Sequence, residues 1–330
     1  MFNRRLFLGA LVILVVVSVC TAAGIFLLYG PTLACVRAAT GPAEPGTSGR
    51  IVYSGGRARC VLLHVPPSAD VSRPRPLVIS LHGFQSKPEL HRFLTRWDDL
   101  ADQHGFLVAY PQGSSFPLRW NANPNANIPQ VDDVQFMADL IATIADVAAV
   151  DPARVYVSGF SNGGQMAHRV ACELADKVAA VGIVAGWGAV LPENCAPSRP
   201  VPLIAFFGTA DRQGDIGGGV SRVNPLVAWA FNLRPGAHTY PPLAEWIGGW
   251  TQRNGCDQVA QPLPQRGDAR GVAFAGCEEG ADVLLYTIQG GGHTWPGGPS
   301  LPFNGKTSRD IDASATMWAF FSRFSLPQNP

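Results

Sequence analysis

Short apolar runs recur along the chain and alternate with segments of helical periodicity. The runs span residues 77–81, 106–110, 154–158, 178–185, 203–207 and 283–288. Each run is continuous rather than alternating polar and apolar, which is typical of strands buried on both faces of a parallel sheet. Between two of them, Met137, Leu140, Ile144 and Ala148 follow helical spacing. The pattern predicts an α/β fold with a doubly wound, mostly parallel sheet and helices on both faces.

The first 34 residues differ from the rest of the chain. A basic start is followed by Leu6–Gly30, which contains no charged residue. Such a run fits either a signal peptide that ends near Ala34 or an uncleaved anchor, a membrane tether through residues 6–30. Lipidation of Cys35 is a third alternative. Each alternative predicts a secreted or otherwise extracytoplasmic protein.

Residues 35–50 are rich in Gly, Ala, Pro, Ser and Thr, which predicts a flexible linker. No second linker or repeat follows, so residues 51–330 are expected to form one catalytic domain. The composition is globular, with 47% hydrophobic and 15% charged residues. A net charge of +1 without a basic stripe argues against a nucleic-acid partner. The oligomeric state stays unknown.

Six cysteines lie beyond the apolar N-terminal run, which itself contains Cys20. An even number in an oxidising compartment predicts disulfide bonds. Pairs that close short loops are favoured: Cys256–Cys277 first, then Cys172–Cys195 and Cys35–Cys60. Buried free thiols remain the alternative, and lipidation of Cys35 would leave Cys60 unpaired.

A G-x-S-x-G motif, Gly159–Gly163, follows the run at 154–158 and precedes a helical stripe. In a strand–turn–helix context this motif exposes its serine on a sharp turn where larger side chains would collide with backbone. The following helix start directs N–H groups toward the place where an oxyanion develops. Ser161 is therefore the predicted nucleophile, and an ordinary Gly–Ser turn is the alternative.

The base and the acid should follow later strands, in the order serine, acid, histidine. His293 comes after the run at 283–288, and it alone among the seven histidines meets both conditions. Asp211 comes after the run at 203–207 and is the predicted acid, with Asp215 as the alternative. The oxyanion hole should use the backbone N–H groups of Asn162 and Phe84, and His82 is expected to brace the loop before Phe84.

Several further motifs surround these residues. They are Leu81–Gly83, Gly105–Gly113, Val131–Phe136, Gly159–Gly164, Gly208–Asp211 and Gly292–Gly298. With these motifs in this order, the chain resembles the polyhydroxybutyrate depolymerase and feruloyl esterase family of α/β-hydrolases. The resemblance implies the α/β-hydrolase fold and a secreted carboxylesterase without a cofactor. It also implies hydroxyalkanoate oligomers, hydroxycinnamoyl esters or acetylated polysaccharides as substrates.

The chain departs from that family at two places. Phe84 stands where members often carry Cys, and residues 214–242 look like an insertion near the acid. Both departures bear on the substrate more than on the chemistry.

Some further residues could have either a structural or a functional role. Asp132 and Asp133 are expected to cap a helix rather than to bind a metal, and no metal site is predicted. Trp120, Trp187 and Trp295 follow predicted strand ends and either line a substrate subsite or belong to the core.

The hypothesis is an exported serine carboxylesterase that acts through an acyl-Ser161 intermediate on a small or polymeric ester. A serine peptidase or acyltransferase on the same fold is the alternative. A non-catalytic surface binding protein is the reading from another class.

Overall fold

The computed structural model describes residues 33–327 except 68–72, 116, 124–130, 189, 191–193, 221–238 and 303. Its centre is a ten-stranded sheet in the order β1-β2-β4-β3-β5-β6-β7-β12-β11-β10. The strands are β1 (Gly46–Ser54), β2 (Arg57–Val65), β3 (Arg75–Leu81), β4 (Leu107–Pro111), β5 (Val150–Phe160), β6 (Ala180–Val184), β7 (Leu203–Gly208), β10 (Gln261–Pro262), β11 (Ala269–Phe274) and β12 (Val283–Ile288). A separate pair joins β8 (Gly219–Val220) to β9 (Thr239–Tyr240).

Six neighbouring strands in the middle of the sheet, β4-β3-β5-β6-β7-β12, pair in parallel. The strands at both ends of the sheet pair antiparallel. The predicted mostly parallel sheet is therefore confirmed. The parallel strands β3, β4, β6 and β7 are buried along nearly their whole length, because helices cover both faces.

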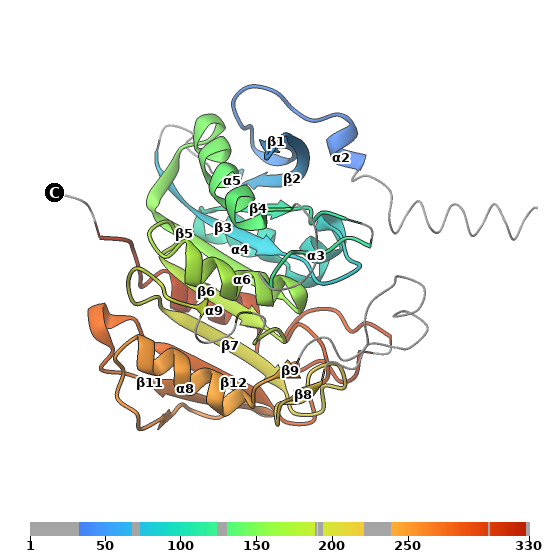
Figure 1. Cartoon of the computed structure of the whole chain (residues 1–330). Coiled ribbons are helices and arrows are strands. Elements are labelled where there is room, and N and C mark those ends of the chain that lie inside the picture. The colour runs from blue at the N-terminus through green and yellow to red at the C-terminus, as the bar shows by residue number, and fades with distance from the viewer. Residues whose placement is uncertain are drawn as a thin grey trace, which may run out of the picture.

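Helices form a layer on each side of the sheet (Figure 1). One layer contains α5 (Asp133–Val147), α6 (Asn162–Glu173) and α8 (Leu243–Arg253), and the other contains α4 (Trp97–His104) and α9 (Ala313–Phe321). The other helices among the described residues are α2 (Leu33–Val36), α3 (Pro88–Thr95) and the short 3₁₀ turn η2 (Glu278–Gly280). Each layer packs its apolar stripe on the sheet, so two hydrophobic clusters form with the sheet between them.

The predicted flexible linker at residues 35–50 is corrected by the structure. Strand β1 begins at Gly46 and pairs with β2 along its whole length. Before it, the N–H of Ala43 donates to the carbonyl of Val147 at 2.6 Å, and Ala43 is buried. This stretch therefore packs as part of the folded domain. The predicted signal peptide or anchor lies almost wholly outside the described residues.

No helix within the described ranges is long and apolar enough to cross a membrane.

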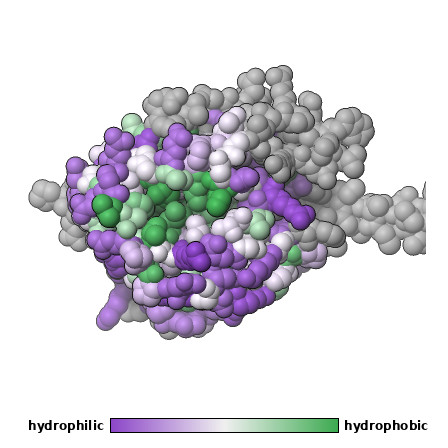
Figure 2. Space-filling model, turned by 90° about the horizontal axis from the view of Figure 1, so that it is seen from below, coloured by the Kyte–Doolittle hydropathy of each residue, from purple (hydrophilic) through white to green (hydrophobic). Residues whose placement is uncertain are grey.

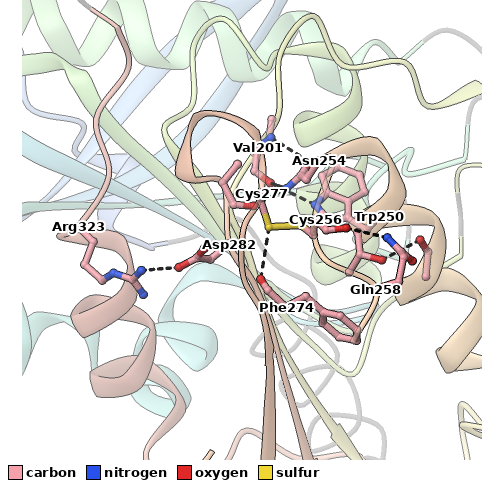
Figure 3. The surroundings of a disulfide bond; sticks show 12 residues. Val201, Trp250, Asn254, Cys256, Gln258, Phe274, Cys277, Asp282 and Arg323 are labelled. Carbon is pink, nitrogen blue, oxygen red and sulfur yellow. Dashed lines mark hydrogen bonds and ion pairs between the residues drawn. A yellow bond between two sulfur atoms is a disulfide. The ribbon is translucent and has the colours of Figure 1, made fainter. Parts of the chain in front are cut away.

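Three disulfide bonds form in the structure: Cys35–Cys60, Cys172–Cys195 and Cys256–Cys277. They are the pairings that close short loops. The Cys35 sulfur is bonded to Cys60, so the predicted alternative of a lipid on this sulfur is corrected. In Figure 3 the Cys256–Cys277 bond joins the end of α8 to the turn after β11.

The buried amide of Asn254 reinforces that junction (Figure 3). Its Nδ2 donates to the carbonyls of Val201 at 2.8 Å and Ala281 at 2.7 Å. The indole N–H of Trp250 donates to the same Val201 carbonyl at 3.1 Å. These bonds fix the chain just before β7 and β12, the two strands that lead toward the candidate site.

The opposite edge of the sheet from β1 is formed by β10, β11 and β12. Seen from below, most of the surface is hydrophilic, and hydrophobic residues gather in one patch (Figure 2).

The Cys172–Cys195 bond yields a stability prediction. Replacing both residues by Ser opens a loop with a sequence separation of 23. Because the unfolded chain then regains the freedom that the bond removed, the free energy of unfolding should fall by about 3 kcal/mol. Urea unfolding followed by circular dichroism measures it. A double variant within about 0.5 kcal/mol of wild type would contradict the prediction.

Candidate active site

Ser161 lies on a strained turn between β5 and α6. Its φ is 55° and its ψ is −121°, a conformation that residues with a side chain rarely adopt. The N–H of Ser161 donates to the carbonyl of Val184 at 2.8 Å, and its own carbonyl accepts from the N–H of Gln165 at 3.0 Å. Both sides of the turn are therefore held by backbone hydrogen bonds.

Three glycines allow the backbone to pack this closely around Ser161. A Cβ on Gly159 would lie 2.1 Å from the carbonyl oxygen of Gly163. A Cβ on Gly163 would lie 2.2 Å from the carbonyl oxygen of Leu81, and one on Gly186 would lie 2.1 Å from that of Ser161. In each case the obstacle is backbone, so no side-chain rotation relieves the collision. The turn requires glycine at all three positions.

His293 and Asp211 form a buried pair. The Nδ1 of His293 lies 2.6 Å from Oδ2 of Asp211. The other carboxylate oxygen accepts from the N–H groups of Gln213 at 2.8 Å and Gly214 at 3.3 Å. This carboxylate accepts on both oxygens, so His293 donates to it through Nδ1. Nε2 is buried and has no hydrogen-bond partner in the described part of the chain.

Asp215, the alternative acid, does not contact His293. It is exposed, and its Oδ1 accepts from the N–H of Gly217 at 2.9 Å, which is a local turn.

Neighbouring strands bring the pair together. Strands β7 and β12 are parallel neighbours, so the loops that follow them leave the same edge of the sheet. Ala210 N–H donates to the carbonyl of Gly291 at 2.8 Å, and Gly290 N–H donates to Oγ1 of Thr209 at 2.8 Å. The ring of Phe160, the residue before Ser161, lies 4.9 Å from the ring of His293. The structure thus pairs His293 with Asp211 and packs His293 on the residue before Ser161, but no hydrogen bond joins His293 to Ser161.

The two predicted oxyanion donors lie on loops that touch Ser161. A Cβ on Gly83 would lie 3.3 Å from Cβ of Ser161, so the loop that carries Phe84 passes directly beside this serine. Asn162 opens α6. Neither backbone N–H has a hydrogen-bond acceptor in the described part of the chain.

His82 braces the loop before Phe84 through both ring nitrogens. Its Nδ1 lies 2.7 Å from the carbonyl oxygen of Gly83, and its Nε2 accepts from the N–H of Gly113 at 2.9 Å. Burial lowers the pKa of His82 to about 4, and the nearby Arg59 charge adds to this effect while the hydrogen bond to Gly83 opposes it. The imidazole is therefore neutral at neutral pH and donates through Nδ1.

The three tryptophans considered for a substrate subsite are interior residues, so that interpretation is corrected. Each is at most 3% exposed. The indole N–H of Trp120 donates to the carbonyl of His82, and that of Trp187 donates to the carbonyl of Pro241. The indole N–H of Trp295 donates to Oγ of Ser314. With the N–H satisfied internally, these residues pack the walls of the site rather than expose a stacking surface.

The two acidic residues at the start of α5 have different roles. Asp132 caps the helix as predicted, because its Oδ1 accepts from the N–H of Gln135 at 2.9 Å. Asp133 is instead completely buried and forms an ion pair with Arg59 at 2.9 Å.

Among the described residues, the cluster with metal-ligand spacing is His168, Cys172 and Cys195, and its two sulfurs form a disulfide bond.

Sequence reasoning missed two contributors to this site. Gly186 packs against the Ser161 carbonyl, and its signal was a glycine just after a predicted strand. The side chain of Asn162 contacts the backbone of Trp120, 42 positions away. No local sequence pattern predicts a contact between residues that far apart in the chain.

The glycine packing predicts the effect of single methyl groups. Gly159→Ala should lose nearly all activity that depends on Ser161 and destabilise the fold by several kcal/mol, because its Cβ meets rigid backbone. Gly248→Ala is the matched control. It lies within α8, where an added Cβ meets nothing within 4 Å, so it should be neutral or stabilising by up to about 1 kcal/mol. Thermal unfolding and activity measure both, and a stable, active Gly159→Ala would contradict the packing argument.

His168 predicts a pH dependence of stability. Burial lowers its pKa to about 3, with the Arg253 charge adding to the effect. Between pH 6 and 4 the unfolded chain binds a proton on this residue and the folded chain does not. The free energy of unfolding should therefore fall as the pH falls, by up to about 1.4 kcal/mol per pH unit from this residue.

Urea unfolding at several pH values measures that slope. His168→Phe should make the slope shallower by up to about 1.4 kcal/mol per pH unit. His104→Phe, at an exposed histidine of α4, should leave it unchanged. Equal slopes in wild type and His168→Phe would contradict the assignment.

Comparisons with known proteins agree with this geometry. The family model described as esterase PHB depolymerase matches residues 60–197. A protein named as an esterase, NocK of Nocardia uniformis subsp. tsuyamanensis, is 31% identical over 83% of this chain and 82% of its own length. Feruloyl esterase B of Piromyces equi is 29% identical over 82% of this chain, and the chain spans about half (46%) of that relative.

A solved structure shows the same fold. The acetyl xylan esterase from Aspergillus awamori superposes with a TM-score of 0.56 at 15% sequence identity, covering 83% of this chain and 99% of that one. The predicted α/β-hydrolase fold is confirmed.

Proposed function

This chain belongs to the PHB depolymerase family of esterases, and from that premise we propose an exported serine esterase that acts through an acyl-Ser161 intermediate. Family membership makes the chain a carboxylic ester hydrolase. The residues that carry out the reaction, its intermediate and its substrate are the proposal.

The observation that carries the proposal is the state of His293. Its Nδ1 is bonded to Asp211, its buried Nε2 has no partner among the described residues, and its ring packs on Phe160, the residue before the positive-φ Ser161. A neutral imidazole in this tautomer is what a serine needs in order to lose its proton. His168 also has a buried ring nitrogen without a partner among the described residues, so the orphaned nitrogen alone does not distinguish His293. What distinguishes His293 is the combination of that free nitrogen with a buried carboxylate on Nδ1.

The reaction has two halves. Ser161 Oγ attacks the ester carbonyl carbon while His293 Nε2 takes the hydroxyl proton, and Asp211 stabilises the imidazolium. The negative oxygen of the tetrahedral intermediate accepts from the N–H groups of Phe84 and Asn162. Collapse breaks the bond to the alcohol oxygen, which receives the proton from His293. Water then repeats the sequence on the acyl-enzyme, releasing the acid and restoring the Ser161 hydroxyl.

The proposed substrates are short hydroxyalkanoate esters, hydroxycinnamoyl esters or acetylated polysaccharides. The names of the matching family and of the relative from Piromyces equi support this set. Phe84 distinguishes this chain within the set, because its half-buried ring lies on the loop beside Ser161. A large ring at that position is expected to alter the acyl pocket beside the oxyanion hole.

Export is part of the proposal. Three disulfide bonds close within residues 35–277. Such bonds persist in oxidising, extracytoplasmic compartments and are rare in the cytosol.

The proposal predicts the outcome of a substrate panel. The full-length chain should hydrolyse p-nitrophenyl acetate and butyrate, methyl ferulate or a hydroxybutyrate oligomer, and the preferred ester identifies the substrate class. Ser161→Ala should lose nearly all of this activity. Asp211→Asn should lower kcat by about 10⁴, because the wrong His293 tautomer is then favoured.

Asp215→Asn is the matched control, since this exposed carboxylate does not contact His293. Its kcat should stay within about twofold of wild type. An inert wild type, or a fully active Ser161→Ala, would contradict the proposal and favour the peptidase, acyltransferase or binding alternatives.

A further inference from the structure

The direction of each oxyanion donor is set by the carbonyl on the other side of its peptide bond. In a trans peptide the C=O and the following N–H point in opposite directions. The carbonyl of Gly83 accepts from Nδ1 of His82 at 2.7 Å and from the N–H of Ser86 at 3.2 Å. Those two bonds hold the Gly83 carbonyl, so they also set where the Phe84 N–H points.

The same rule applies to the second donor. The carbonyl of Ser161 accepts from the N–H of Gln165 as the first bond of α6. The N–H of Asn162 therefore points away from the helix. Two donors with fixed directions still need a fixed separation, because each lies on a different loop.

Trp120 connects the two loops. Its backbone N–H donates to Oδ1 of Asn162 at 2.7 Å, and its backbone carbonyl accepts from Nδ2 of the same amide at 3.2 Å. Its indole N–H donates to the carbonyl of His82 at 2.8 Å. Trp120 thus contacts Asn162, which supplies one donor. It also contacts His82, which lies two positions before Phe84, the residue that supplies the other donor.

The surroundings make this connection rigid. Trp120 is 1% exposed and its ring stacks on Phe136 at 6.4 Å between centroids. The His82 ring lies 5.2 Å from the Trp120 ring and its Nε2 accepts from Gly113. A buried and fully bonded network of this kind has little freedom to adjust when one member is removed.

We propose that Trp120 is a positioning residue that fixes the separation of the two oxyanion donors, with the Asn162 side chain as its contact on one loop and the His82 carbonyl as its contact on the other. The assignment rests on the proposed function. It gives Asn162 two separate roles: its backbone N–H binds the oxyanion, and its side chain holds that N–H in place.

The arrangement predicts a loss specific to the transition state. An oxyanion hole that is misplaced by a fraction of an ångström still admits the ester but stabilises the tetrahedral oxygen less. Trp120→Phe removes the indole N–H and keeps an aromatic ring, whereas Asn162→Ala removes the amide and keeps the backbone donor. Each should lower kcat by about 10-fold to 100-fold with KM within about threefold of wild type.

The experiment measures kcat, KM and the inhibition constant of a boronic acid on the full-length chain with p-nitrophenyl butyrate. The boronate forms a tetrahedral adduct on a serine, so its inhibition constant should weaken by the same factor as kcat/KM. Rates are normalised to the active fraction from end-point titration with a fluorophosphonate, so partial misfolding does not enter. In the double variant, kcat should lie within about twofold of the kcat of the slower single variant, because both changes break the same connection.

Two controls match the substitutions. Trp97→Phe makes the same change at a buried indole whose N–H has no partner in the described part of the chain. Asn121→Ala removes a neighbouring amide that donates to the carbonyl of Val131 instead. Both should keep kcat within about twofold of wild type.

Three outcomes would overturn the inference: kcat near wild type in both single variants, equal losses in the controls, or multiplied losses in the double variant. A Ser161→Ala chain that still hydrolyses the ester would instead overturn the proposed function. The two failures are therefore distinguishable.

Discussion

Backbone packing around Ser161 is the constraint on which the rest of the site depends. Positive φ at a serine is costly, and the turn persists because β5, α6 and the chain after β6 hold it from several sides. The same packing brings the first turn of α6 against the carbonyl of Leu81 at the end of β3. The same backbone packing therefore fixes the position of the Ser161 hydroxyl and the direction of the start of α6. It also places the loop that carries Phe84 next to Ser161.

The sheet positions the other two predicted triad residues, which the turn at Ser161 does not. Strands β7 and β12 deliver Asp211 and His293 to the same edge, and hydrogen bonds between their loops hold the pair together. Disulfide bonds and the buried amide of Asn254 fix the chain near the starts of these strands. Precision at the site therefore comes from long-range tertiary contacts rather than from any one loop.

Much of this could be predicted from the sequence. Continuous apolar runs predicted the parallel sheet, and the G-x-S-x-G motif between strand and helix predicted the turn at Ser161. The linker prediction at residues 35–50 failed because small and polar residues also occur in a strand such as β1, where pairing with β2 decides the structure.

The tryptophans at strand ends were ambiguous for a similar reason. An indole looks the same in sequence whether its N–H meets substrate or a carbonyl of the interior, and only the fold shows which. Contacts such as that between Trp120 and Asn162 join distant positions, and no periodicity encodes them.

The most direct test of the account is covalent labelling of the nucleophile. The full-length chain is treated with a fluorophosphonate, and the adduct is located by peptide mass mapping. The account predicts one adduct per chain on Ser161, with labelling greatly slowed in a His293→Ala variant. No adduct, or an adduct on another residue, would contradict the assignment of Ser161 as the nucleophile.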